Sequence, residues 1–269
     1  MLGRVLRVLA AGVVLTVVQG AAARLVDALL GPSGVALRPG ALGWVALSNL
    51  LTAAMLAWLA AWSRLTGLRL AGWLAVVLFG IATFNNLIEA VFFHVFGVAE
   101  FVRYVLQGAL TAAAFAPVLV FIMGRRASAG RARAAAAASR PGPWRLAAAD
   151  LLYLACYLGA GTAIYPWVRE FYLDRDQPAQ LLVAAMQLFF RGPIFIALTL
   201  FVVRMIDGER WERVLVAGAA LSVVGGVAPL LIPNPYLPDV VRWAHLFEVG
   251  LSNLAYGAAA AWLLTPPRP

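Results

Sequence analysis

The feature that most limits the fold of this chain is the repetition of apolar runs of about 20 residues, the length with which an α-helix crosses a hydrocarbon core of about 30 Å. The chain has 269 residues, of which 63% are hydrophobic and 12% are charged. Soluble domains carry about 25% charged residues. A membrane β-barrel would show alternating segments of about 10 residues instead. The sequence therefore predicts an all-α, polytopic integral membrane protein.

We expect eight transmembrane helices, joined by short polar connections. The first apolar run follows Arg4 and Arg7 and contains three consecutive alanines at 21–23, so it also resembles a secretory signal. Its apolar character continues to Leu30, and a span of that length favours retention in the membrane. The expected spans cover, approximately, residues 8–30, 42–62, 70–96, 104–123, 146–168, 178–203, 214–232 and 233–264.

The distribution of arginine predicts the orientation. All 21 basic residues are arginine, and most of the net charge of +9 falls in connections on one side of an eight-span layout. Cytoplasmic loops collect basic residues. We therefore expect a protein of the bacterial inner membrane with both termini in the cytoplasm. We interpret the positive charge as a signal of topology and not as a nucleic-acid-binding surface. Residues 124–145 form the expected Arg/Ala-rich cytoplasmic loop between spans one to four (1–123) and spans five to eight (146–269).

Two likenesses hint at a 4+4 internal duplication. The two sets of four spans are similar in length, and Arg103-Tyr104 opens the fourth span much as Arg242-Trp243 opens the eighth. A second likeness, between 47–58 and 251–262, cuts across this division. Internal repeats are common in membrane transporters.

Polar side chains lie within several of the expected spans, where they are costly unless they face a bundle interior or a wet cavity. In the last span, Arg242, His245, Glu248 and Ser252 step by three, three and four residues, which places them on one helix face. At a rise of about 1.5 Å per residue, spans two, three, six and eight bring their most polar groups to similar depth. The predicted binding residues or buried polar network are Arg191, Glu89, Glu248, His245, Asn85, Asn86, Gln187, Asn253, Ser252 and Asn49.

Arg191 is the most demanding of these groups, because a guanidinium does not readily lose its proton. At mid-membrane depth it requires a carboxylate, an anion or water. We expect Glu89 or Glu248 as its partner. Gly192-Pro193 follows directly, and we expect this pair to loosen the helix beside the site.

Three functions remain open on this pattern. The first is a carrier or receptor-like protein whose outward-facing pocket binds a small polar or anionic molecule, with the lipid bilayer as its surroundings. The second is an intramembrane enzyme that uses Glu248 and His245 as acid and base. The third is a structural or assembly protein in which the ion network only holds the helices together.

Neither a cofactor nor a metal is predicted. The two histidines, His94 and His245, are the residues through which a haem or metal would have to be bound. The single Cys156 excludes an internal disulfide. Ser252 lies about two turns from His245, so the pair does not form a convincing nucleophile and base.

Overall fold

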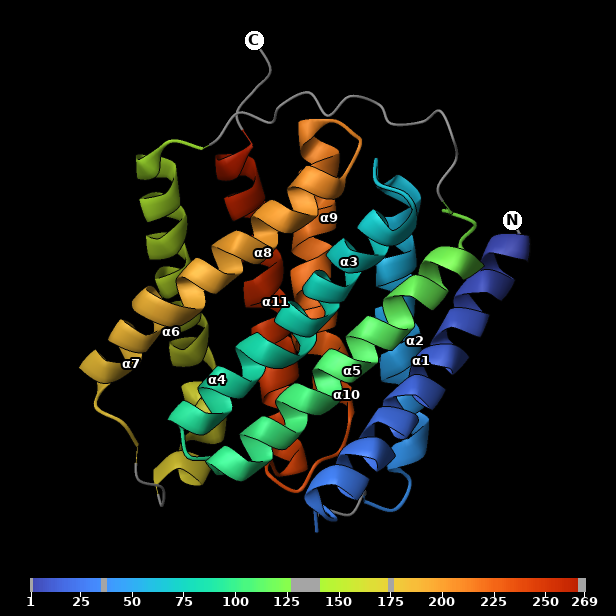
Figure 1. Cartoon of the computed structure of the whole chain (residues 1–269). Helices are drawn as coiled ribbons and strands as arrows, with labels where there is room; N and C mark the ends of the chain where they lie inside the picture. The colour runs from blue at the N-terminus through green and yellow to red at the C-terminus, as the bar shows by residue number, and fades with distance from the viewer. Residues whose placement is uncertain (1, 35–37, 127–140, 174–176, 266–269) are drawn as a thin grey trace.

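The computed structural model describes residues 2–34, 38–126, 141–173 and 177–265 (Figure 1). Within these ranges the chain is helical and contains no β-strand, apart from one isolated bridge between Ser63 and Ile206. Most of the Arg/Ala-rich loop, including Arg131, Arg133 and Arg140, lies outside the described residues.

The helices follow one another with short connections. Three segments are π-helices, labelled η, and each continues the α-helices on either side of it. The elements are α1 (Leu2–Leu30), α2 (Ala41–Trp62), α3 (Gly67–Leu78), η1 (Phe79–Phe84), α4 (Asn85–Phe92), α5 (Val98–Ile122), α6 (Pro143–Leu173), α7 (Gln180–Met186), η2 (Gln187–Arg191), α8 (Gly192–Met205), α9 (Arg210–Ser222), η3 (Val223–Val227), α10 (Ala228–Leu231) and α11 (Asp239–Leu264).

Seven helical segments of the described chain are long and apolar enough to cross a membrane: α1, α2, α3–α4, α5, α6, α7–α8 and α9–α10. The helix α11 is similar in length, with 26 residues, but carries Asp239, Arg242, His245 and Glu248 in its first three turns. The fold is thus all-helical and compatible with a multi-pass membrane protein, as the composition predicts.

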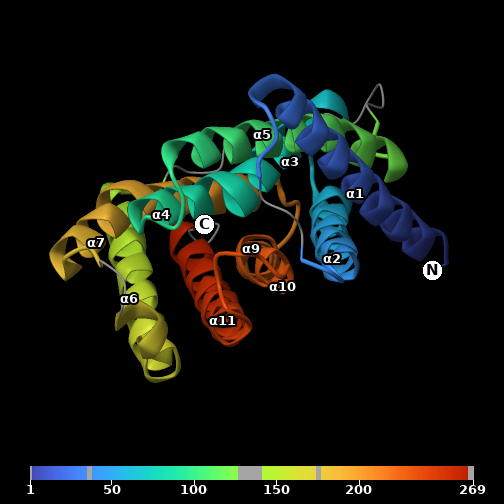
Figure 2. The same cartoon turned by 90° about the horizontal axis from the view of Figure 1, so that it is seen from below.

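The helices form two crossed layers. In one layer, α5 packs between α1 and α3–α4, and α3 in turn contacts α8. In the other, α11 packs between α6 and α9, and α10 contacts α2. Figures 1 and 2 show the first layer running diagonally across the second. The middle segments η1 and η3 meet where the layers face each other.

The order of helices in the two layers corresponds. Numbered along the chain, with α11 as the eighth, the long helical segments of the first layer follow one another as first, fourth, third and sixth, and those of the second as fifth, eighth, seventh and second. Adding four to each number of the first series gives the second series, if the count returns to one after eight. Each layer therefore contains three segments from one half of the sequence and one from the other half.

We call the end of the bundle where α1 begins and α11 ends the proximal end, and the opposite end the distal end (upper and lower in Figure 1). Arginines bind the carbonyl groups that close helices at both ends. Arg103 donates to the carbonyls of Leu30 and Gly31 after α1, and Arg145 donates to that of Leu263 in the last turn of α11. Similar contacts join Arg7 to Met123, Arg125 to Ser63 and Leu65, Arg210 to Trp262, and Arg242 to Leu230 and Leu231.

These contacts have a common cause. The last four carbonyls of a helix have no partner within it, and a cation there also complements the helix dipole. A forked guanidinium supplies both the charge and several donors. Many of the arginines near helix ends therefore donate hydrogen bonds to the free carbonyls at the C-termini of neighbouring helices.

Two local features of the structure involve Arg103. Residues 100–103, which fall between the expected spans 70–96 and 104–123, lie in the first two turns of α5. Asp27 pairs with Arg103 of α5 at 2.5 Å, although Arg24 lies one turn away on its own helix. From the same position Arg103 also reaches the carbonyls of Leu30 and Gly31.

Candidate polar site

The centre of the site is the π-helical segment η2, which ends at Arg191. Pro193 lacks a backbone N–H and cannot donate to the carbonyl four residues earlier. The backbone N–H of Gly192 bonds to the carbonyl of Gln187, five residues back, which is the π pattern. Gln187 and Arg191 are buried, while Phe189 and Phe190 between them are exposed on the opposite side. The loosening expected beside Gly192-Pro193 thus takes the form of a π segment.

Arg191 is held by residues from α4 and from its own segment. Its Nη1 lies 2.8 Å from Oε1 of Glu89 and donates to Oε1 of Gln187 at 3.3 Å. The side chain of Arg191 is 5% exposed and that of Glu89 is 30% exposed. Of the two carboxylates expected as partners, the structure therefore pairs Arg191 with Glu89, and the carboxylate is the more accessible member of the pair.

The helix α6 contributes the aromatic wall of the site. The hydroxyl of Tyr153 donates to Oε1 of Gln187 at 3.0 Å, and its ring stacks on Phe195 at 4.6 Å between centroids. Tyr157, one turn further along α6, interacts with the carboxylate of Glu89, and its ring lies 5.8 Å from the guanidinium carbon of Arg191. The site thus joins α4, α6, η2 and α8.

Three buried polar atoms around η2 have no hydrogen-bond partner among the described residues. They are Nε of Arg191, Nε2 of Gln187 and Oδ1 of Asp150. Asp150 lies so close to Gly192 that a Cβ on that glycine would sit 1.9 Å from its Oδ1. Buried polar groups are almost always hydrogen-bonded, and two of these three are donors. The region around η2 therefore presents two buried donors and one buried acceptor that the described residues do not pair.

A second polar cluster lies nearer the distal end, between α6 and α11. Nδ1 of His245 is 2.5 Å from Oε2 of Glu248, and Nε2 of His245 is 2.7 Å from the hydroxyl of Tyr172. The side chain of His245 is 19% exposed and that of Glu248 is 10% exposed. Ser252 instead donates to the carbonyl of Val249, so the structure shows no hydrogen bond between it and His245.

The remaining amides that the sequence suggests are distributed over separate helix contacts. Nδ2 of Asn49 donates to Gln19 at 2.8 Å and to Thr16 at 3.2 Å, so it joins α2 to α1. Nδ2 of Asn86 reaches the carbonyl of Gly225 at 3.2 Å, and Nδ2 of Asn253 that of Leu221 at 3.3 Å. Asn85 is buried beside them with Oδ1 unpartnered. A single chamber shared by spans two, three, six and eight is therefore replaced by several clusters.

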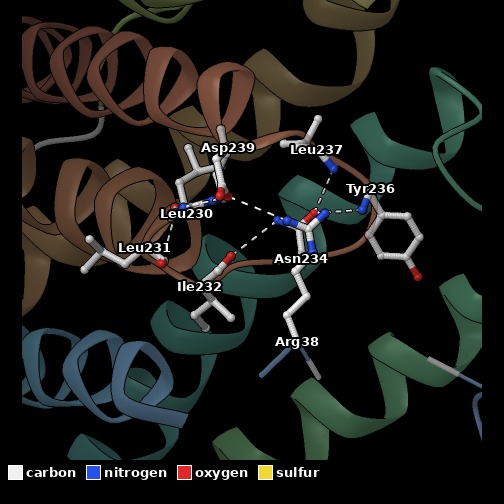
Figure 3. Close-up of polar contacts among 9 residues, drawn as sticks. Arg38, Leu230, Leu231, Ile232, Asn234, Tyr236, Leu237 and Asp239 are labelled. Carbon is white, nitrogen blue, oxygen red and sulfur yellow. Dashed lines mark hydrogen bonds and ion pairs between the residues drawn. The ribbon is translucent and has the colours of Figure 1, made fainter. Parts of the chain in front are cut away.

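The distal connection between α10 and α11 is fixed by its own polar contacts (Figure 3). Oδ1 of Asn234 accepts the backbone N–H groups of Tyr236 and Leu237, each at 3.0 Å, which is the turn that asparagine favours. Arg242 donates to Asp239 at 3.1 Å and to the carbonyls that end α10. Arg242, which the sequence places on the His245 stripe, therefore closes a neighbouring helix.

The two histidines occupy different surroundings. His94 follows the end of α4 with a φ of 53° and lines a shallow groove with Phe92, Gln177 and Leu182. His245 bonds to Glu248 on its own helix, α11, and to Tyr172 on the facing helix α6. No group of three or more metal-ligand side chains is assembled within the described ranges.

Comparison of the chain with protein-family profiles, curated proteins and solved structures gave no significant match. The site is therefore interpreted from its own geometry.

Sequence reasoning missed four members of these clusters, namely Asp150, Tyr153, Tyr157 and Tyr172, all on α6. Tyr153 and Tyr157 are four residues apart, and this spacing places them on one helix face. A tyrosine at helical spacing is as typical of packing as of a site. Tyr153 and Tyr157 are recognised as part of the site only because the structure places Arg191 beside them.

Proposed function

We propose that this protein is an eight-span membrane carrier that binds a small anionic or polar molecule at Arg191. The decisive observation is a buried guanidinium that is only partly paired, beside an unpartnered amide of Gln187. A planar guanidinium matches a carboxylate or phosphate oxygen in geometry and in charge. Glu89 is the counter-charge when the site holds no anion.

We further propose that α11 is the eighth span, that the proximal end faces the cytoplasm and that the membrane is a bacterial inner membrane. Arg4, Arg7, Arg64 and Arg69 lie in or beside the ends of α1, α2 and α3 that meet at the proximal end, while Asp27, Glu100 and Asp239 lie in the ends of α1, α5 and α11 that meet at the distal end. This bias agrees with the excess of basic residues in cytoplasmic loops. The matching order of helices in the two layers supports a parallel 4+4 duplication, an architecture in which substrate sites lie near the middle of the membrane.

The test of the carrier is uptake by purified protein in liposomes, with radiolabelled acetate, lactate, phosphate and glycine supplied separately. We expect at least one of them to accumulate above protein-free liposomes. R191L should abolish that uptake, whereas R24L, at an exposed arginine of α1, should leave it unchanged. Because a lone buried carboxylate destabilises a fold, R191L is measured together with R191L/E89Q, which removes both charges.

A structural or assembly protein, in which the ion pair only holds helices together, would give the opposite result. If the ion pair only joins α4 to η2, the double variant R191L/E89Q should fold and keep any transport that the natural protein shows. Transport by a correctly folded double variant would refute the assignment of Arg191 as the anion-binding group.

The second candidate is an intramembrane enzyme, favoured by the close contact of His245 with Glu248. A carboxylate that fixes and polarises an imidazole is the arrangement of a general base. No serine or cysteine nucleophile bonds to His245 among the contacts described, so the reaction would use water. Uptake in which the labelled molecule is recovered unchanged inside the liposomes favours the carrier, and recovery of a modified product favours the enzyme.

A further inference from the structure

The Tyr172–His245–Glu248 cluster takes no part in holding Arg191, yet it consists of groups that exchange protons. The three side chains are joined by contacts of 2.7 and 2.5 Å. His245 lies in the second turn of α11, roughly 9 Å from Asp239 at the distal end, and keeps 19% of its side-chain surface exposed. Histidine is the side chain that ordinarily changes charge near neutral pH. The cluster therefore lies between the distal end of the bundle and the more buried carboxylate of Glu248.

One face of α6 leads from this cluster to the Arg191 site. Tyr153, Tyr157 and Gly161 follow one another at four-residue spacing, and Tyr172 lies three turns beyond Gly161 on the same side. Oε1 of Glu248 would lie 3.8 Å from a Cβ on Gly161. Tyr157, one turn deeper, interacts with Glu89. The two carboxylates thus approach α6 about one helical turn, or 6 Å, apart.

The side of α11 that faces α6 supplies a hydroxyl group between the carboxylates of Glu248 and Glu89. Ser252 follows Glu248 by one turn, and Tyr256, another turn on, contacts the ring of Tyr153 at 5.3 Å between centroids. Ser252 therefore lies on α11 at the level between Glu248 and the Tyr153 wall. The hydroxyls of Ser252 and Tyr157, with a bridging water, provide the donors and acceptors that a proton needs over such a distance.

We propose that Glu89 is a proton-accepting site supplied from the distal end through Tyr172, His245 and Glu248, and that its protonation releases Arg191 to an incoming anion. Water gives a proton to the hydroxyl oxygen of Tyr172 as that hydroxyl passes its own proton to Nε2 of His245, and the proton on Nδ1 passes to Oε2 of Glu248. Glu248 then gives a proton to the carboxylate of Glu89 through the hydroxyls of Ser252 and Tyr157. One carboxylate becomes neutral, and one anion takes its place beside the guanidinium. This inference rests on the proposed carrier function and names its coupling ion.

The charged and titratable groups around the cluster are few among the described residues. From α6 the titratable side chains on this face are Tyr153, Tyr157 and Tyr172, and beyond them lie Glu89 of α4 and Arg191 of η2. The contact of α11 with α9 and η3 is made by small or neutral residues, among them Gly218, Ser222 and Gly226. On α11 itself, Asp239 and Arg242 pair with each other one turn nearer the distal end.

The experiment uses infrared spectroscopy of the full chain in lipid, with rapid mixing to a lower pH and no transported molecule present. The C=O band of a protonated carboxyl group reports Glu89 directly, and the band that disappears in E89Q is assigned to it. We expect H245A to slow the appearance of this band by roughly 10²-fold, the usual contribution of a proton-transferring side chain. Free imidazole in the buffer should restore the rate, because it replaces the missing ring.

The second histidine is the matched control. H94A changes a histidine near the same end of the bundle and should leave the rate unaltered. If H245A does not fold, H245Q replaces it, since glutamine keeps the volume and hydrogen bonds but cannot relay a proton. An E89Q-sensitive band that appears equally fast without His245, a slowing that imidazole does not relieve, or the lack of such a band would overturn the proposal. Proton transfer with no anion uptake would refute the carrier alone.

Discussion

At the scale of single residues, the structure pairs the buried guanidinium of Arg191 with the more accessible carboxylate of Glu89. A guanidinium that is 5% exposed cannot shed its charge, so its partner matters more than that of an exposed arginine. The pair of Arg38 and Asp239, at 3.7 Å with both side chains exposed, is the natural comparison.

We predict that E89L destabilises the protein by about 3–5 kcal/mol, the effect of leaving a buried charge unpaired. R38A should change stability by no more than about 1 kcal/mol, as exposed ion pairs do. Reversible unfolding in mixed detergent measures both values. Equal effects of the two substitutions would contradict the view of Arg191 as a buried charge.

The carboxylate of Asp150 gives a second prediction at this scale. A Cβ at Gly192 would meet Oδ1 of Asp150 at 1.9 Å, whereas one at Gly72 of α3 would meet nothing within 4 Å. G192A should therefore destabilise the protein by about 1–3 kcal/mol, the usual cost of overpacking. G72A should be neutral or slightly stabilising, because alanine favours the helix more than glycine. The double variant D150A/G192A should recover most of the loss if the clash is the cause, and thermal unfolding shows whether it does.

At the scale of helices, the arginines that close neighbouring helix ends explain why short connections suffice. Arg103 binds Asp27 at 2.5 Å and the carbonyl of Gly31 at 2.7 Å, so one side chain joins α5 to the end of α1. Hydrogen bonds to charged groups contribute about 1.5–3 kcal/mol each.

We predict that R103A lowers stability by about 2 kcal/mol and frees the end of α1. R103K should recover only part of this, because an ammonium cannot bond the carboxylate and the carbonyls in the same fork. Hydrogen exchange at the last turn of α1 should rise in R103A and stay low in R24A. Unchanged exchange in R103A would show that the end of α1 is held by packing alone.

The sequence predicted long apolar helices but not which helices pair. Seven of the described helical segments are long and apolar enough to cross a membrane, and Arg191 within an apolar run called for a carboxylate, an anion or water. Whether that carboxylate was Glu89 or Glu248 depended on which helices lie side by side, and spacing along one helix carries no such information. Asn49 illustrates the limit, because its depth matched that of the other polar groups while its actual partners, Thr16 and Gln19, lie on α1.

At the scale of the whole molecule, the crossed layers make the two halves of the chain dependent on each other. The helix α2 belongs to the layer of the second half, and α7–α8 to the layer of the first. Neither half can complete its layer without the other.

We predict that the proximal connection between α5 and α6 is cytoplasmic and that the connection before α5 is external. In a C156S background, A99C should react with a membrane-impermeant maleimide in intact cells, and R126C only after permeabilisation. A tag placed after α11 should likewise be reached only in permeabilised cells. A tag accessible from outside would show that α11 does not cross, and would reduce the count to seven spans.

Glycines bring α9 and η3 almost into backbone contact with α11. A Cβ on Gly257 would lie 2.9 Å from the Cα of Gly218, and one on Gly226 would lie 3.1 Å from the backbone of Gly250. Helices whose backbones pack this closely cannot slide past one another without steric clashes. If the protein is the carrier proposed above, the rearrangement that admits or releases cargo would fall on α6 and α7 at the periphery, with the glycine seam as the fixed frame.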